Sequence, residues 1–74
     1  MNETTIELVN SIKRIRKEKG LSQVELAKRC NVPQSTIGRI ENLSMNPSVD
    51  IVCKILDVLN MKIELTEKTA IPNL

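Results

Sequence analysis

Residues 34–40 combine hydrogen-bonding side chains with two apolar ones. The segment reads QSTIGRI, in which Ile37 and Ile40 fall on one face of a helix. The other residues would face away from that side: Gln34, Ser35, Thr36, Gly38 and Arg39. In the major groove of DNA, Gln can pair with adenine, Arg with guanine, and Ser or Thr with either base. The segment therefore predicts a short helix, at about 34–42, whose polar face could contact base edges.

A second short helix is predicted just upstream, at about residues 23–29. Ser22 and Glu25 have the S-x-x-E spacing of a capping box, in which each side chain accepts a hydrogen bond from the backbone amide of the other residue. Its apolar face would carry Leu26, Ala27 and Cys30, with Val24 nearby.

A tight break separates these two helices at residues 31–33. Asn31 tolerates a left-handed backbone, and Pro33 disfavours the α conformation at Val32. Two helices joined by such a turn form the layout of a helix-turn-helix, whose second helix enters the major groove. Ala27 would be small because the helices cross close to its Cβ. The layout alone fits a helical hairpin with a solvated polar face equally well.

Further helices are predicted on both sides of this pair. Thr4 and Glu7 repeat the capping spacing, so a first helix should begin near Thr5 and end at Gly20. Ser48 should cap a fourth helix. Apolar residues at helical spacing predict the buried faces: Leu8, Val9, Ile12 and Ile15 in the first helix, and Val52, Ile55, Leu56 and Leu59 in the fourth.

Three motifs closely resemble the Cro/repressor-type, or Xre-like, helix-turn-helix family. They are LSQxELA at 21–27, STIxRIEN at 35–42 and NPS at 46–48, and the similarity extends from about residue 12 to residue 59. The resemblance implies an all-α, λ-repressor-like domain of four helices. It also implies sequence-specific binding to double-stranded DNA, and it makes the simple hairpin the weaker interpretation.

The resemblance assigns base contacts to the third helix. Gln34, Ser35 and Arg39 match the family's base-contacting positions, and Thr36 is secondary to them. Two residues depart from the family pattern. Pro33 occupies a position where many relatives have a capping Ser or Thr. Gly38 supplies no side chain and costs about 1 kcal/mol of helix propensity, so it could either allow a closer approach to DNA or weaken discrimination.

Other positions match residues that contact phosphates or join helices in the family. Gln23 would meet a phosphate at the positive end of its helix. Arg16 matches an arginine that pairs with Glu41, and its outer edge would be available to a phosphate. Ser44 and Asn46 match a phosphate-contacting loop, although both also serve as ordinary turn formers.

After Asn60 the apolar pattern changes to alternation, which predicts a strand over residues 61–68. A single strand needs a partner, and the chain holds no other strand pattern. The predicted partner is the same strand of a second copy, pairing across a two-fold axis through Met61, Ile63 and Leu65. This feature resembles the antitoxin branch of the family. A disordered tail is the alternative.

Length and composition bound the remaining expectations. The 74 residues predict a DNA-binding domain at 1–60, the dimerisation strand at 61–68 and a flexible tail at 69–74.

With no histidine and two cysteines, no metal site and no cofactor are expected, and Cys30 and Cys53 are predicted to be small buried residues. The absence of aromatic residues disfavours single-strand binding by base stacking. No signal peptide or membrane span is evident, which predicts a cytoplasmic protein without a membrane partner.

The net charge of +2 is unevenly distributed. Residues 1–43 carry eight basic and five acidic side chains, whereas residues 44–74 carry three basic and four acidic ones. A basic half joined to a slightly acidic half suits a DNA-binding face opposite a protein-contact face.

Together these patterns predict a homodimeric transcriptional regulator, acting as a repressor on a pseudo-palindromic operator. Two roles remain open: a repressor acting alone, or an antitoxin that represses its own operon and also binds a protein toxin. An interaction module that has kept the fold without binding DNA is the alternative from another class. An enzyme is not expected, because the sequence offers no histidine, phosphate-binding glycine loop or nucleophile–base pair.

Overall fold

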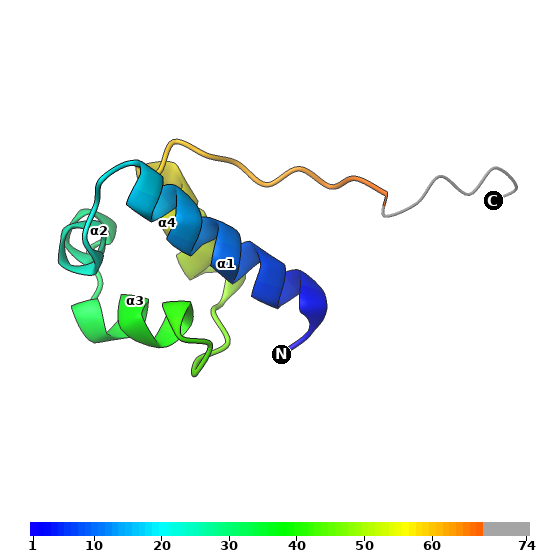
Figure 1. Cartoon of the computed structure of the whole chain (residues 1–74), viewed down its shortest axis with the longest axis horizontal. Coiled ribbons are helices and arrows are strands. Elements are labelled where there is room, and N and C mark those ends of the chain that lie inside the picture. Colours follow the sequence, from blue (N-terminus) through cyan, green and yellow to red (C-terminus); the bar gives the residue numbers. More distant parts are fainter. Residues whose placement is uncertain (68–74) are drawn as a thin grey trace, which may run out of the picture.

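The computed structural model describes residues 1–67, which contain four helices and no strand. The helices follow the predicted order: α1 (Glu3–Glu18), α2 (Gln23–Cys30), α3 (Gln34–Glu41) and α4 (Val49–Val58) (Figure 1). The predicted all-α, four-helix fold is confirmed. None of these helices is long and apolar enough to cross a membrane.

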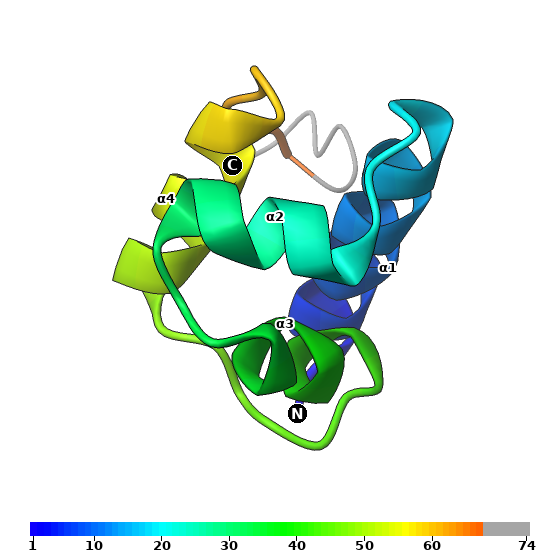
Figure 2. The same cartoon turned by 90° about the vertical axis from the view of Figure 1, so that its left-hand side faces the viewer.

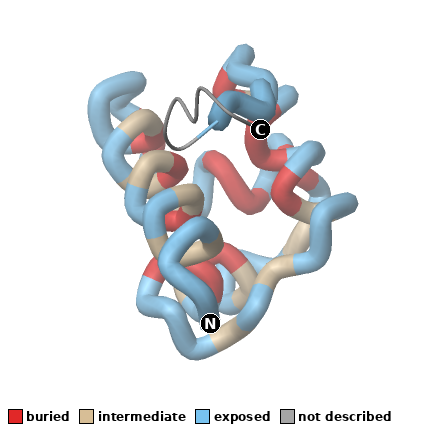
Figure 3. Tube along the Cα trace, turned by 90° about the vertical axis from the view of Figure 1, so that its right-hand side faces the viewer, coloured by how far each residue is buried: buried red, intermediate tan, exposed pale blue. Residues whose placement is uncertain are grey.

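All four helices contribute to one apolar core. Figure 2 shows α2 lying across the molecule between α4 and α1, with α3 below it in this view. The buried parts of the helices face the space that they share (Figure 3). The core residues are Val9, Ile12, Leu21, Leu26, Ala27, Cys30, Ile37, Ile40, Val52, Ile55, Leu56 and Leu59. Leu8 and Ile15 are half-buried against this core.

Helix α1 begins two residues earlier than predicted. Asn2, not Thr4, is the N-cap, and its Oδ1 accepts a hydrogen bond from the Thr5 backbone amide at 2.8 Å. Asn ranks above Thr as a capping residue, and the Asn2 Oδ1 also accepts a hydrogen bond from the Thr5 hydroxyl at 2.9 Å. Gly20 follows the end of α1 as predicted: it has φ 71°, and the Leu21 amide returns to the Arg16 carbonyl at 3.1 Å.

The predicted capping box and turn are both present between α1 and α3. Ser22 Oγ accepts from the Glu25 amide at 3.0 Å, and Glu25 Oε1 accepts from the Ser22 amide at 3.1 Å. Asn31 ends α2 in the left-handed conformation with φ 58°. Pro33 then caps α3 without any side-chain hydrogen bond, as its chemistry requires. Ala27 is buried in the shared core, and its predicted place at the crossing of the two helices stays a prediction.

The prediction for the two cysteines is half wrong. Cys30 is buried in the core, but Cys53 is exposed on α4. The helical pattern explains the difference, because Cys53 follows the buried Val52 and lies about 100° further around the helix, outside the apolar stripe.

Residues 61–67 leave α4 as an extended segment, drawn in orange in Figure 1. The Met61 amide closes the end of α4 by donating to the Leu56 carbonyl at 2.8 Å. Beyond it the segment makes no strand pairing within residues 1–67. The predicted strand requires a second copy of the chain and stays a prediction. Its last residue, 68, and the predicted flexible tail at 69–74 lie outside the described residues.

Candidate nucleic-acid interface

Helix α3 presents its polar side to solvent because its apolar side is packed in the core. Ile37 and Ile40 are 1% and 0% exposed, whereas Gln34, Ser35 and Arg39 are all exposed. Thr36 is half-buried at the edge of this face. None of the ion pairs formed within residues 1–67 includes Arg39, so its guanidinium is available for an external acceptor.

A buried ion pair holds α3 against α1. Arg16 Nε lies 2.6 Å from Glu41 Oε2, and Arg16 Nη2 donates to Glu41 Oε1 at 2.8 Å. Arg16 Nη1 also donates to the Leu21 carbonyl at 2.6 Å. The two side chains are only 8% and 3% exposed. A bidentate pair in which every buried nitrogen and oxygen atom has at least one partner is the arrangement in which a buried charge can be tolerated.

This burial bears on the phosphate contact predicted for Arg16. Three of its five N–H groups are engaged inside the protein, and the residue is 7% exposed. A phosphate could reach only the remaining N–H groups. Burial therefore favours the structural part of the prediction over the DNA contact.

The ion pair continues into the polar face of α3 through two glutamines. Gln23 Nε2 donates to Glu41 Oε1 at 3.1 Å, and Gln34 Nε2 donates to Gln23 Oε1 at 2.9 Å. Gly38 lies beside this chain of bonds: a Cβ added there would stand 3.4 Å from Gln23 Oε1 and 3.8 Å from Gln34 Nε2. Gln23, predicted to contact a phosphate, and Gln34, predicted to contact a base, are thus hydrogen-bonded to each other.

Sequence reasoning missed this contact, although a signal was present. Both glutamines occupy the first position of their helices, and the helix-turn-helix brings those helix starts together. Gly38 follows Gln34 by one turn, so the face beside the amides carries no side chain.

Ser44, in the loop after α3, forms hydrogen bonds within the protein. The Ser44 amide donates to the Arg39 carbonyl and to Asn42 Oδ1, each at 3.0 Å, and its hydroxyl donates to the Arg39 carbonyl at 3.3 Å. Ser44 therefore closes the end of α3, which was one of its two predicted roles. Asn46 is exposed two residues further on.

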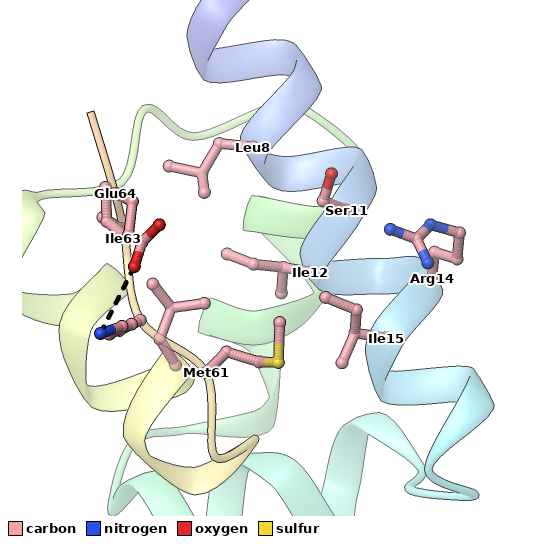
Figure 4. Close-up of a pocket in the computed structure, with 10 residues that line it drawn as sticks. Leu8, Ser11, Ile12, Arg14, Ile15, Met61, Ile63 and Glu64 are labelled. Atoms are coloured by element: carbon pink, nitrogen blue, oxygen red, sulfur yellow. Dashed lines mark ion pairs between the residues drawn. The ribbon is translucent and has the colours of Figure 1, made fainter. Parts of the chain in front are cut away.

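Two of the predicted dimerisation residues lie beside α1, in the segment that follows α4. Met61 and Ile63 line an apolar groove with Leu8, Ile12 and Ile15 (Figure 4). These two residues are still 41% and 48% exposed, and Leu65, the third residue of the alternating set, is 96% exposed. The segment thus presents apolar surface that residues 1–67 leave uncovered.

Comparisons with known proteins connect this geometry to a family. The chain matches the helix-turn-helix family model over residues 12–65. It is 37% identical over 67 residues to antitoxin HipB of Escherichia coli O6:H1, covering 89% of this chain and 71% of HipB. It is 43% identical over 60 residues to the transcriptional regulator SinR of Bacillus licheniformis, covering 77% of this chain and 54% of SinR.

Solved structures of HipB share the fold. A HipB–O2 20mer complex superposes with a TM-score of 0.82 at 30% identity, covering 93% of this chain and 96% of that chain. A HipA–HipB–O2–O3 complex gives a TM-score of 0.81 at 30% identity, covering 93% and 97%.

Proposed function

Because the chain belongs to the helix-turn-helix family of Cro/C1-type DNA-binding regulators and antitoxins, we propose that it is a non-catalytic repressor that binds a specific DNA duplex as a homodimer. One observation carries the proposal: α3 buries Ile37 and Ile40 and leaves Gln34, Ser35 and Arg39 exposed. A helix held in this way can enter a major groove without disturbing the core.

The base contacts would come from the outer side of α3. Arg39 can pair with guanine through two N–H groups, and Gln34 can pair with adenine. Ser35 can meet either base, and Thr36 would act from the edge of the same face. Because base contacts discriminate while phosphate contacts only position, these four residues would determine which operator is bound.

Phosphate contacts would flank the recognition helix. Gln23 stands at the N-terminus of α2, where the helix dipole favours an anion. Ser44 and Asn46 would meet the backbone from the loop, and Arg16 only through the N–H groups left free by its internal bonds. These contacts would supply much of the affinity, which should fall steeply as salt rises.

The C-terminal segment would join two copies. An antiparallel pairing of residues 61–67 with a second copy would satisfy their backbone groups and cover Met61, Ile63 and Leu65, which are 41% to 96% exposed. The two α3 helices would then reach successive major grooves about 34 Å apart on a pseudo-palindromic operator.

An antitoxin role is the more specific form of the proposal. Among its relatives, HipB is named an antitoxin and is found in a complex with HipA. SinR, by contrast, is named a transcriptional regulator. A protein toxin would therefore be a second partner. Co-purification of the chain with the product of an adjacent gene, and relief of that product's toxicity, would test this role.

Selection from a random duplex library tests DNA binding directly. The full chain should enrich a pseudo-palindrome, and light scattering should give two chains per duplex. Arg39→Ala should weaken binding to the selected duplex by roughly 1–3 kcal/mol while changing binding to random DNA much less. Lys54→Ala provides the matched control, because Lys54 is an exposed basic residue on α4, outside the proposed interface.

Each result has a contrary outcome. Equal losses on selected and random duplexes would remove Arg39 from base reading. If no sequence is enriched at all, the proposal fails, and the fold would be serving as a protein-interaction module instead. Monomers bound to separate half-sites would refute the dimer.

A further inference from the structure

We propose that Leu43, in the loop after α3, is a DNA-contacting residue. Its apolar side chain would pack on a C–H surface of the duplex, either a deoxyribose ring or a thymine methyl group. Such a contact rests on the proposed DNA-binding function and adds an apolar component to its polar contacts.

All four helices of residues 1–67 end in the same backbone motif. At each end, one amide donates to the carbonyl three residues before it, and the next amide donates to the carbonyl five residues before it, at 2.8–3.2 Å. This pair of bonds defines the Schellman motif, whose first residue adopts the left-handed conformation. The four first residues, with their φ angles, are Gly20 (71°), Asn31 (58°), Leu43 (64°) and Asn60 (57°). The four helix ends can therefore be compared position by position.

The end of α3 is the exception at the left-handed position. Glycine has no Cβ, and asparagine has a short polar side chain, so both adopt a positive φ readily. A bulky residue such as leucine is an outlier there, and the conformation is strained. Leu43 therefore imposes a cost on the fold that the other three helix ends avoid.

The end of α3 is also the exception at the next position of the motif. An apolar residue commonly follows the left-handed one and packs back on the helix. The other three ends follow this pattern: Leu21 is buried in the core, Val32 packs against it, and Met61 lines the groove beside α1. In α3 the corresponding residue is Ser44. The cap of α3 thus lacks the apolar contact that supports the others.

Core packing does not compensate for the strain at Leu43. The residue is 38% exposed, and it lies outside both the buried core and the half-buried residues packed against that core. The loop is attached to the core by a different apolar residue, Met45. Since strained residues persist where they serve a function, we look for a contact of Leu43 outside the chain.

The position of Leu43 favours DNA as its partner. The residue lies between Arg39, a proposed base contact, and Ser44 and Asn46, proposed phosphate contacts. Its loop lies on the opposite side of the molecule from residues 61–67 in both Figure 1 and Figure 2. A second copy joined through that segment would leave the loop open, whereas a duplex lying against α3 would cover it. Deoxyribose rings lie between phosphates and bases, and thymine presents its methyl group in the major groove.

Two variants separate the side chain of Leu43 from its backbone. Leu43→Ala removes the apolar surface but keeps a strained residue, and Leu43→Gly removes both. Because the side chain is the proposed contact, each variant should bind the selected duplex roughly three- to tenfold more weakly, by the same factor. Leu43→Met is the matched control: it keeps the apolar surface and should keep the affinity.

Stability provides a second readout that a purely structural role would move in the other direction. Leu43→Gly should raise the urea midpoint, because glycine adopts the positive φ without strain. A variant more stable than the wild type would then bind DNA less tightly. Asn60→Leu places leucine at the equivalent position after α4 and should lower the midpoint. If Leu43→Gly instead unfolds at lower urea, leucine serves the fold and the inference fails.

Uracil-containing duplexes distinguish the two C–H surfaces. Uracil lacks only the methyl group of thymine, so it can replace the thymines of the selected duplex one at a time. If Leu43 meets a methyl group, one replacement should weaken the wild type and leave Leu43→Ala unaffected. If it meets a deoxyribose ring, no replacement should have this effect, and Leu43→Ala should lose as much on random DNA as on the selected duplex.

The remaining outcomes separate this contact from the proposed function. Wild-type affinity in both Leu43→Ala and Leu43→Gly would refute the contact, while sequence-specific binding would stand. A loss in Leu43→Gly alone would refute it too, because the backbone and not the side chain would be responsible. If light scattering without DNA showed that Leu43→Ala dissociates the dimer, Leu43 would belong to a protein interface instead. If the wild-type chain bound no duplex, the proposed function itself would have failed.

Discussion

Removing one partner of the Arg16–Glu41 pair should expose how strongly the fold depends on it. Arg16→Met would leave the Glu41 carboxylate buried, with its 3%-exposed side chain bonded only to Gln23. Breaking a buried pair in this way typically costs 3–5 kcal/mol. A chain of 74 residues has a total free energy of unfolding of about 4–11 kcal/mol. Arg16→Met should therefore lose roughly a quarter or more of the stability.

Replacing both partners should recover part of this loss. In Arg16→Met/Glu41→Leu no charge remains buried, so the largest penalty disappears. Recovery will be incomplete, because the Leu21 carbonyl loses the N–H group that lies 2.6 Å from it. An unpaired buried acceptor costs about 1–3 kcal/mol. The double variant should thus be more stable than Arg16→Met and less stable than the wild type.

Urea unfolding followed by circular dichroism measures these differences, since the chain has no aromatic residue for intrinsic fluorescence. Arg14→Met is the matched control on the same helix. Arg14 pairs with Glu18 at 3.0 Å, but both side chains are about 60% exposed, and such pairs contribute at most about 1 kcal/mol. The reasoning is refuted if Arg16→Met costs no more than Arg14→Met, or if the double variant is no more stable than Arg16→Met.

Three further predictions concern single sites. Gly38→Ala should raise the free energy of unfolding by about 0.5–1 kcal/mol, because alanine is the better helix former and the added methyl has room; a loss in urea midpoint would contradict this. Cys53 should react with a thiol reagent in the folded protein before Cys30 does, since burial raises the pKa of the Cys30 thiol; equal rates in the two single-cysteine variants would oppose it. Hydrogen bonds from Ser22 lower the pKa of Glu25 below its ordinary value of 4.5, so this carboxylate stabilises the fold above that value and its contribution is lost as the pH falls through the lowered pKa. Glu25→Gln should consequently flatten the acid side of the stability profile.

The local features of the fold were predictable because they depend on residues close in sequence. The capping box at Ser22 and the left-handed turn at Asn31 are set by side chains that bond to backbone within a few positions. The exposed polar side of α3 followed from the spacing of Ile37 and Ile40 in the same way. The packed core is compatible with this cap, this turn and this orientation of α3, so the local preferences are kept in the folded chain.

Three features were not predicted: which of two capping residues starts α1, the exposure of Cys53, and a contact between two helices. Two capping residues, Asn2 and Thr4, stood near the start of α1, and the spacing to Glu7 pointed to the weaker one. Cys53 lay within an apolar run, and the miss there came from overlooking that it lies about 100° around the helix from the buried Val52. The contact between Gln23 and Gln34 joins two helices, and no pattern within either helix describes it.

Glu41 bonds both to Arg16 in the interior and to Gln23 beside the polar face of α3, which ties the proposed recognition surface to the core. A substitution at Glu41, Gln23 or Gln34 would disturb neighbours that share the same bonds, so several changes would be needed together. Ser35 and Arg39 have exposed side chains for which none of these side-chain bonds is described. A change in the proposed recognition surface should therefore be easiest at those two positions, because each side chain can be replaced without disturbing the bonds among Glu41, Gln23 and Gln34.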